Sequence, residues 1–217
     1  TRLRTVTGVQ TCALPIFRDA RAFLYLSTFY IEYDEYGIPL LAALRDAQGR
    51  GVAINLLIDG FGQRLGGVLM SRADRRALAG ELDALRSSGG VVTVYRPARA
   101  VQRWVGGGQH VKIQVSEAGE AIFGSSNITK SSFEGWNEYS VALRGPVVAT
   151  LLDSYRHLGG HVAGEHLEWL DRVSRDDSCE LTVDYWFCNP NLTQGPSGPF
   201  GWRGENRSEE HTSELQS

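Results

Sequence analysis

The chain has 217 residues, of which 22 are Lys or Arg and 25 are Asp or Glu, giving a formal net charge of −3 at pH 7. A mildly acidic chain lacks the bulk positive charge with which many proteins hold nucleic acid, so we expect nucleic acid to be the less favoured partner. No apolar run approaches the roughly 18 residues needed to cross a bilayer, which predicts a cytoplasmic protein or one peripheral to a membrane.

The two ends of the chain differ in character from its middle. Residues 1–16 and 207–217 resemble peptides that arise when sequencing-adapter DNA is translated, so we expect both to lie outside the natural fold. A signal peptide is a poor alternative for residues 1–16, because polar residues interrupt every apolar stretch there. We therefore predict a domain over residues 17–166, followed by a connector over residues 167–206 toward a second unit.

The first half of this domain predicts strands and helices in alternation. Residues 21–27 are typical of a strand buried on both faces, and residues 38–47 carry the apolar stripe of a helix. Residues 52–58 form the second strand and end in a turn at residues 59–62. A unit of this kind predicts two parallel strands joined by a right-handed crossover.

A second amphipathic helix over residues 69–85 and a third strand over residues 91–95 extend the pattern, so we expect a layered α/β domain. The loop of residues 96–108 comes next and carries Arg96, Arg99 and Arg103. Two interpretations of this loop stay open: a plain surface loop, or a lip whose arginines face an anionic group.

The stretch from Gln109 to Ser140 carries the chemistry. His110 and Lys112 alternate with apolar residues, which predicts both side chains on one face of a β-strand. Residues 121–123 form a returning strand, which ends in the small polar turn of residues 124–127. This combination suits a phosphate group. Lys supplies positive charge, the turn supplies hydrogen-bond donors, and His can attack or move a proton.

The spacing of these residues resembles the signature motif of the phospholipase D superfamily. His110-x-Lys112 is followed after four residues by Glu117, and after six more by Gly124-Ser125-x-Asn127. The superfamily motif has Asp at the position of Glu117. The longer side chain keeps the charge and changes the hydrogen-bond geometry.

The resemblance extends beyond the motif over most of residues 17–160. The block of residues 37–62 resembles cardiolipin synthase-like members, and so do Trp136, Glu138 and the pair Gly145-Pro146. This resemblance implies an α/β fold of the phospholipase D-like layered sandwich type. Its sheet would be mixed and mostly parallel, flanked by helices, with one repeat only.

The resemblance also implies an activity, namely cleavage of phosphodiesters or transfer of phosphatidyl groups through a covalent phosphohistidine, with no metal or other cofactor. Catalytic roles would fall to His110 as the nucleophile, Lys112 and Asn127 as ligands of the phosphoryl oxygens, Glu117 as the motif carboxylate and Glu138 as the carboxylate that orients the histidine. The substrate would also be bound by Gly124, Ser125 and Ser126.

Members of the superfamily place two such motifs in one cleft, and this chain contains one. The other histidines, His157, His161, His166 and His211, lack a Lys two residues later. We therefore expect a phospholipid-acting half-enzyme that is inactive alone, with peripheral membrane contact. Its partner would be a second repeat in the same full-length chain or a second copy in a homodimer. A homodimeric nuclease and a catalytically silent anion-binding repeat remain as alternatives.

The last part of the domain predicts a strand over residues 138–143 and a helix that begins at Pro146. The Gly-Gly pair between His157 and His161 should end this helix, so we expect no metal site there. Beyond it, residues 181–187 read as a strand. Cys179 and Cys188 lack metal-binding spacing, and their redox state stays open.

Overall fold

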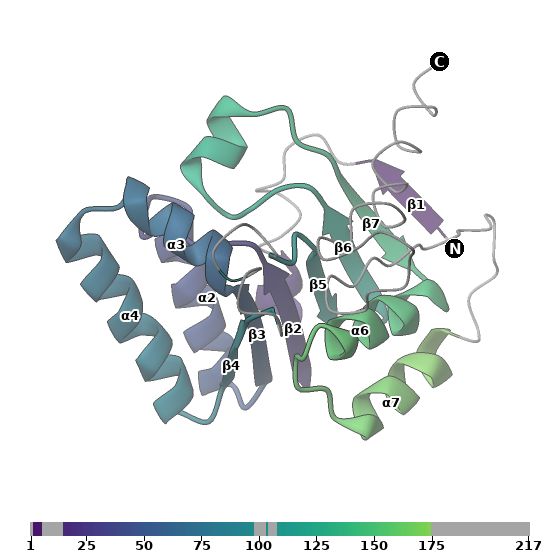
Figure 1. Cartoon of the computed structure of the whole chain (residues 1–217). Helices are drawn as coiled ribbons and strands as arrows, with labels where there is room; N and C mark the ends of the chain where they lie inside the picture. Colours follow the sequence, from purple (N-terminus) through teal and green to yellow (C-terminus); the bar gives the residue numbers. More distant parts are fainter. Residues whose placement is uncertain (1, 6–14, 98–102, 104–107, 175–217) are drawn as a thin grey trace, which may run out of the picture.

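The computed structural model describes residues 2–5, 15–97, 103 and 108–174. They form a seven-stranded sheet in the order β1-β7-β6-β5-β2-β3-β4, with helices on both faces (Figure 1). The strands are β1 Arg2–Thr5, β2 Phe23–Thr28, β3 Ala53–Asp59, β4 Val91–Tyr95, β5 Lys112–Ser116, β6 Glu120–Gly124 and β7 Ser140–Arg144. The helices are α2 Gly37–Gly49, α3 Gly60–Leu69, α4 Arg72–Ser87, α6 Val147–His157 and α7 Gly164–Ser174, with a π-helix, η1 Ser131–Gly135.

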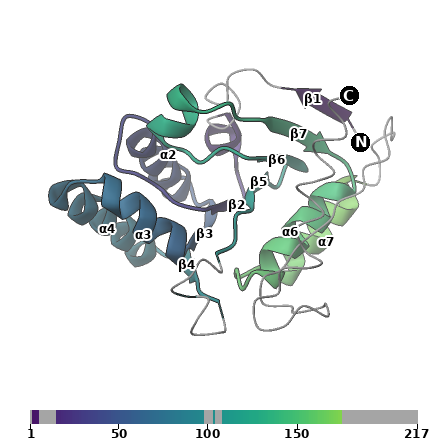
Figure 2. The ribbon, with the colours of Figure 1, turned by 45° about the horizontal axis from the view of Figure 1, so that its top comes forward.

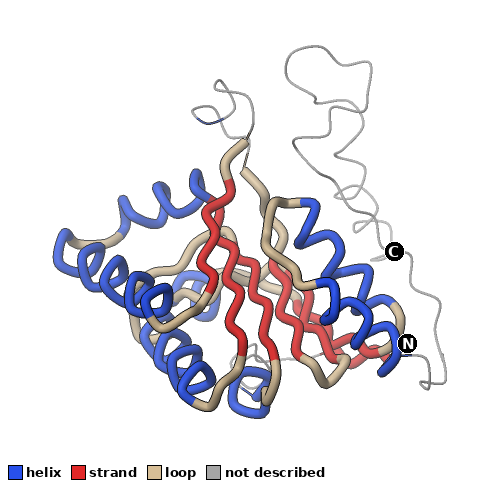
Figure 3. Tube along the Cα trace, turned by 90° about the horizontal axis from the view of Figure 1, so that it is seen from below, coloured by secondary structure: helices blue, strands red, loops and turns tan. Residues whose placement is uncertain are grey.

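The sheet is mixed, as the sequence predicts. β2 and β3 are parallel neighbours, as are β3 and β4. The other four pairs are antiparallel: β2 with β5, β5 with β6, β6 with β7, and β7 with β1. Five strands, β1, β2, β3, β4 and β6, therefore run in one direction, and β5 and β7 run in the other. Figure 3 shows the strands as one sheet between two groups of helices.

Strand β2 explains why both faces of the sheet are covered. Leu24 and Leu26 belong to a buried cluster with residues of α2 and α4, while Phe23 and Tyr25 belong to a second cluster with residues of α6. Successive side chains of a strand point to opposite faces, so an unbroken apolar run needs helices on both sides. Figure 2 shows α2, α3 and α4 on one side of the sheet and α6 and α7 on the other.

The segment between β3 and β4 differs from the prediction of one turn and one helix. Helix α3 begins at Gly60, directly after β3, because the Asp59 side chain accepts hydrogen bonds from the N–H groups of Phe61 and Gly62. A second helix, α4, begins after Ser71, which forms a capping box with Asp74. Two N-terminal caps thus divide the segment into two helices.

Two segments outside the predicted domain of residues 17–166 pack against it. Arg2–Thr5, within the residues expected to lie outside the fold, pair with the outer strand β7 as β1. Unpaired N–H and C=O groups of an outer strand favour such an addition. At the other end, α7 continues past residue 166, because Leu170 is fully buried in the cluster that contains α6.

Helix α6 agrees with the prediction at both of its ends. Pro146 is its N-cap residue, and the chain leaves the helix before Gly159, which has a φ of 82°. The predicted strand at residues 181–187, together with Cys179 and Cys188, lies outside the described residues. Within the described part of the chain, no helix has the length and apolar character needed to span a membrane.

Candidate active site

The candidate site lies at the edge of the sheet where β2 and β3 end and β5 begins. β5 is antiparallel to β2, with Ile113 opposite Ser27, so the start of β5 lies beside the end of β2. β6 pairs with β5 so that Gly124 is opposite Lys112. This register places the start of the turn at residues 124–127 beside Lys112.

Lys112 is a buried cation, with 5% of its surface exposed. Its Nζ donates a hydrogen bond to the His110 carbonyl at 2.9 Å and lies 5.6 Å from the centroid of the Phe29 ring. Burial lowers the pKa of Lys112 from 10.5 to about 7, while the Glu138 and Asp59 carboxylates act in the opposite direction. Near pH 7 Lys112 is therefore only partly protonated, and an anion bound beside it would favour the charged form.

His110 precedes the strand, which corrects the expectation that His110 and Lys112 share one strand face. β5 begins at Lys112. Just before it, the backbone is hydrogen-bonded to side chains and not to a neighbouring strand. Gln109 Oε1 accepts the N–H of Val111 at 2.9 Å, and Ser27 Oγ donates to the Val111 carbonyl at 2.8 Å. The backbone at His110 is thus held by side chains of Gln109, Lys112 and Ser27.

The imidazole of His110 is exposed on one side and packs edge to face against Phe29 on the other, with 4.7 Å between ring centroids. Desolvation by the surrounding protein, followed by the Lys112 charge, lowers the pKa of His110 from 6.5 to about 4. Solvent at the exposed side weakens this lowering of the pKa. A lowered pKa still favours a neutral ring at pH 7. A neutral imidazole retains the lone pair that attack on phosphorus requires.

Asp59 fixes the backbone next to His110. Its carboxylate is fully buried and accepts hydrogen bonds from the N–H groups of Phe61, Gly62 and Gln109 at 2.8, 2.6 and 2.8 Å. Burial raises the pKa of Asp59, and these N–H groups act against that rise. A Cβ at Gly108 would lie 2.9 Å from Asp59 Oδ1, so glycine is needed for this close approach.

The turn after β6 contributes three polar side chains with different surroundings. Ser125 is exposed, and its hydroxyl donates to the Glu138 carboxylate and accepts the N–H of Tyr139 at 3.0 Å. Ser126 Oγ is buried and has no hydrogen-bond partner within the described residues. Asn127 Oδ1 accepts from Thr28 Oγ1 and from the Phe29 N–H, each at 3.3 Å. Asn127 therefore joins the turn to the end of β2.

Glu138 lies near Lys112 and Ser125, but no hydrogen bond to His110 is present among the described residues. Its Oε2 accepts from Ser125, whereas Oε1 is buried without a partner in the described part of the chain. The expected role of orienting the histidine directly is therefore not seen in this geometry. Glu138 instead positions Ser125 and adds negative charge close to Lys112.

Glu117 does not join the cluster. It follows the far end of β5, and its carboxylate accepts the backbone N–H groups of Arg21 at 2.6 Å and Phe23 at 3.3 Å. Val111 and the five residues of β5 separate it from His110, which corresponds to about 23 Å of extended chain. The structure therefore gives the Glu117 side chain the role of anchoring the start of β2.

Three residues of the site are absent from the sequence prediction: Phe29, Asp59 and Gln109. Phe29 follows the end of β2 and Asp59 ends β3, so both lie where parallel strands finish. In open α/β sheets that edge is where ligands bind, and this signal could have placed both residues in the site. Gln109 had no such signal, since its role depends on contacts with Ser27, Thr28 and Val111.

The described histidines outside the motif lie away from His110, and His211 is outside the described residues. His157 is close to Asp153 on α6, and His166 Nδ1 is 2.7 Å from the Tyr25 hydroxyl. Within the described ranges, no three His, Cys, Asp or Glu side chains gather in a way that could hold a metal ion. The groups described at the site are the imidazole of His110, the buried amine of Lys112, and the hydroxyls of the turn.

Comparison with known proteins places this geometry in a wider context. The family model described as cardiolipin synthase, phospholipase D-like domain, matches residues 14–157. No curated protein sequence matches the chain.

Solved structures with the same fold include three bacterial proteins. Nuc, a phospholipase D family member from Salmonella typhimurium, has a TM-score of 0.54 at 16% identity, with 74% of this chain and 97% of that chain covered. Phosphatidylserine synthase from Haemophilus influenzae has a TM-score of 0.56 at 14% identity, with 79% of this chain and 42% of that chain covered. NucT from Helicobacter pylori has a TM-score of 0.50 at 14% identity, with 73% and 92% covered. At such identities the likeness shows the fold alone.

Proposed function

The chain belongs to the cardiolipin synthase, phospholipase D-like domain family, and from that premise we propose that it is one half of an enzyme that cleaves phosphodiesters or transfers phosphatidyl groups. His110 would be the nucleophile of a covalent phosphohistidine intermediate. The substrate class we favour is a glycerophospholipid. Family membership supports phosphodiester chemistry in general, and the site geometry supports the individual roles.

The observation that carries the proposal is the pairing of a neutral, exposed imidazole with a buried lysine. The pKa of His110 is lowered to about 4 and that of Lys112 to about 7. At pH 7 the imidazole keeps its lone pair, and the lysine still bears part of its charge. An anionic phosphodiester would be attracted by Lys112 and attacked by His110 without prior proton transfer.

In the first step, a nitrogen of His110 forms a bond to phosphorus while the bond from phosphorus to the leaving alcohol oxygen breaks. That oxygen takes a proton from a second acid. In the second step, water or another alcohol attacks phosphorus and gives its proton to the conjugate base of that acid, while the bond from phosphorus to the imidazole breaks. Lys112 and the unpaired hydroxyl of Ser126 would stabilise the phosphoryl oxygens, with Asn127 holding the turn in place.

None of the other described histidines lies next to His110, so no second histidine is placed there to act as the acid. His157 and His166 lie with Asp153 and Tyr25, respectively. We infer that a second His-Lys motif supplies it, from another repeat of a longer chain or from a second copy. The exposed face of His110 is the side from which such a partner would approach.

A nuclease assembled from two copies is the second candidate. This chain covers 97% of Nuc, so a unit of this size occurs as a whole chain, and 42% of phosphatidylserine synthase, so it also occurs within a longer one. The net charge of −3 favours the lipid substrate, since nucleic-acid enzymes commonly carry a basic surface.

Trapping the intermediate tests the proposal. The chain alone, and the chain together with a second His-Lys motif in a longer protein or a homodimer, would each be mixed with phosphorus-labelled phospholipid vesicles and quenched in denaturant. With both motifs present we expect label on the protein that is lost in acid and kept in alkali, and that His110→Ala abolishes. His161→Ala, at an exposed histidine away from the cluster, should keep the label. Normal turnover by His110→Ala would exclude the proposed nucleophile.

A further inference from the structure

Helix α3 presents its large apolar side chains to solvent, which reverses the usual arrangement of a surface helix. Leu65, Val68 and Leu69 are 48%, 79% and 71% exposed. The buried residues of the same helix are Gly62 and Gly66. The helix therefore packs on the domain through its glycines, and its larger apolar side chains stay mostly in water.

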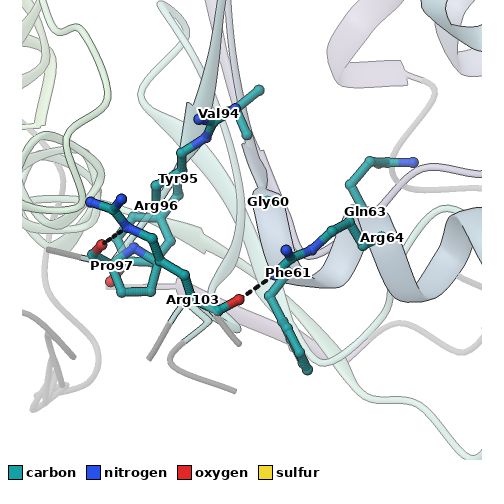
Figure 4. A pocket seen from close by; sticks show the side chains of 9 residues that line it. All are labelled: Gly60, Phe61, Gln63, Arg64, Val94, Tyr95, Arg96, Pro97 and Arg103. Atoms are coloured by element: carbon teal, nitrogen blue, oxygen red, sulfur yellow. Dashed lines mark hydrogen bonds between the residues drawn. The ribbon is translucent and has the colours of Figure 1, made fainter. Parts of the chain in front are cut away.

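These exposed side chains lie together on one side of the helix. Positions 65, 68 and 69 have the spacing of neighbours on a helix surface, and Phe61 lies one turn before Leu65. Phe61 also lines a cavity of about 490 Å³ between the start of α3 and the end of β4, and Val94 lies on the β4 side of it (Figure 4). We call Phe61, Leu65, Val68 and Leu69 the apolar strip.

Positive charge lies beside the far end of the apolar strip, where α3 leads into α4 (Figure 1). Arg72, Arg75 and Arg76 are exposed residues in the first turns of α4. Arg75 Nη1 donates to the carbonyls of Gly67 and Met70 at 2.6 and 3.0 Å, which places its guanidinium at the C-terminal end of α3. The charge and the apolar strip therefore belong to one continuous surface.

The acidic residue of this turn is engaged elsewhere. The Asp74 carboxylate accepts the N–H of Ser71 at 3.3 Å and its hydroxyl at 2.6 Å, as part of the capping box. Arg72 and Arg76 form no ion pair with any described residue. The chain has a net charge of −3, so an anionic surface would be attracted by this patch and not by the charge of the whole chain.

The size of the apolar strip distinguishes between the surfaces that could cover it. Ten residues of helix span about 15 Å, and the strip is one helix wide. A stable protein interface buries about 800 Å² on each partner, which is much more than such a strip offers. A helix at a bilayer surface needs only to place its apolar side at the boundary between head groups and acyl chains, and nearby arginines gain from anionic lipids.

We propose that the apolar strip, together with Arg72, Arg75 and Arg76, is the surface through which this protein lies on a membrane that contains anionic phospholipids. The inference goes beyond the proposed function, because adsorption requires neither the nucleophile nor a second motif. The side chains of the strip enter the head-group boundary, and the arginines contact lipid phosphates.

Co-sedimentation with lipid vesicles tests this surface without catalysis. The background is His110→Ala, which removes the proposed nucleophile. We expect the background to bind vesicles of phosphatidylcholine and phosphatidylglycerol in equal amounts, and to bind vesicles of phosphatidylcholine alone more weakly. Binding to the mixed vesicles should fall in about 1 M NaCl, where charges are screened beyond about 3 Å. Val68→Asp, and Arg72→Gln with Arg76→Gln, should each weaken this binding at least about tenfold.

Matched changes elsewhere on the surface are the controls. Val173→Asp alters an exposed valine of α7, and Arg86→Gln with Arg156→Gln removes two exposed positive charges from other sites. Both controls should bind like the background. Urea unfolding checks that all variants are folded.

Three outcomes would overturn the inference. The first is that the background does not bind the mixed vesicles, and the second is that Val68→Asp binds them as well as Val173→Asp does. The third is a dimer in solution, measured by light scattering, that Val68→Asp converts to a monomer while vesicle binding is unchanged, since the strip would then contact a second copy. Absence of label in the phosphohistidine experiment alters none of these measurements, so the two proposals fail separately.

Discussion

The buried carboxylate of Asp59 accepts a hydrogen bond of 2.8 Å from the backbone N–H of Gln109, which lies 50 residues further along the chain. The same carboxylate caps the first turn of α3 through Phe61 and Gly62. One side chain therefore fixes the end of β3, the start of a helix and the backbone that leads into His110. Such support from behind the reacting group is what holds a catalytic side chain in a productive position.

Replacing Asp59 with Asn tests this role. The amide has one oxygen for three N–H donors, and its NH₂ group would face one of them, which leaves buried donors unpaired. We expect the free energy of unfolding to fall by roughly 1–3 kcal/mol and kcat to fall at least about tenfold. Urea unfolding of the chain gives the first value, and initial rates on phospholipid vesicles with the second motif present give the other.

Asp83→Asn is the control for this change, because Asp83 is an exposed residue of α4 paired with Arg86. Its unfolding free energy should change by less than about 0.5 kcal/mol. If kcat falls no further in Asp59→Asn than in Asp83→Asn, the Asp59–Gln109 contact does not position His110.

The low pKa of Lys112 predicts a pH-dependent stability. Below pH 7 both the folded and the unfolded chain carry the proton, and the cost of burying the charge is fully present. Between about pH 7 and 10.5 the folded lysine is neutral while the unfolded lysine still binds its proton, so folding is favoured as pH rises. Lys112→Met lacks this group, so the stability of the natural chain relative to the variant should increase over this interval.

Unfolding in urea at pH values from 6 to 10 measures that difference. Lys130→Met, at an exposed lysine paired with Glu35, should show a constant difference from pH 7 to 9. A constant difference for Lys112→Met as well would mean that Lys112 keeps its proton in the folded protein.

The sequence predicts a helix or strand well where the pattern of buried residues lies within that element. β2, α2, β3 and α6 were predicted to within a few residues, since each has its own apolar period. Helix α3 was not predicted, because Gly60 and Gly62 belong to a sequence typical of a turn at residues 59–62; Gly66 lies further along the same helix. These glycines allow close packing, since a Cβ at Gly62 would lie 2.3 Å from the Phe29 carbonyl and one at Gly66 2.6 Å from the Tyr30 ring. A sequence does not reveal which neighbour a helix must approach.

The candidate site could likewise be predicted only in part from the sequence. β5 and β6 form a simple hairpin, which places Gly124 opposite Lys112, while His110 lies two residues before the strand. Glu117 shares the motif in sequence yet lies at the opposite end of β5. The contact between Asp59 and Gln109 joins distant segments, so it could be found only once the sheet order was known.

Glu117→Gln separates a structural role from a catalytic one. The carboxylate accepts two backbone N–H groups at the start of β2, and Gln would place its own NH₂ against one of them. We expect the unfolding free energy to fall by about 1–2 kcal/mol, with kcat per folded molecule unchanged. Glu165→Gln, at an exposed glutamate of α7, should change neither quantity. A hundredfold loss of kcat at unchanged stability would instead restore Glu117 to the catalytic centre.

Gly124 should tolerate no side chain, because β6 ends against the following strand at this residue. A Cβ there would lie 2.3 Å from the Tyr139 carbonyl and 2.6 Å from Ser140 Oγ. Gly124→Ala must therefore move the backbone that carries Ser125 and its bond to Glu138, and we expect a loss of more than about 2 kcal/mol in the unfolding free energy. Gly135→Ala is the control, since a Cβ at Gly135 meets nothing within 4 Å, and it should stay within about 0.5 kcal/mol of the natural chain. Equal melting curves for Gly124→Ala and Gly135→Ala would show that a Cβ at position 124 can be accommodated, against the expectation from these distances.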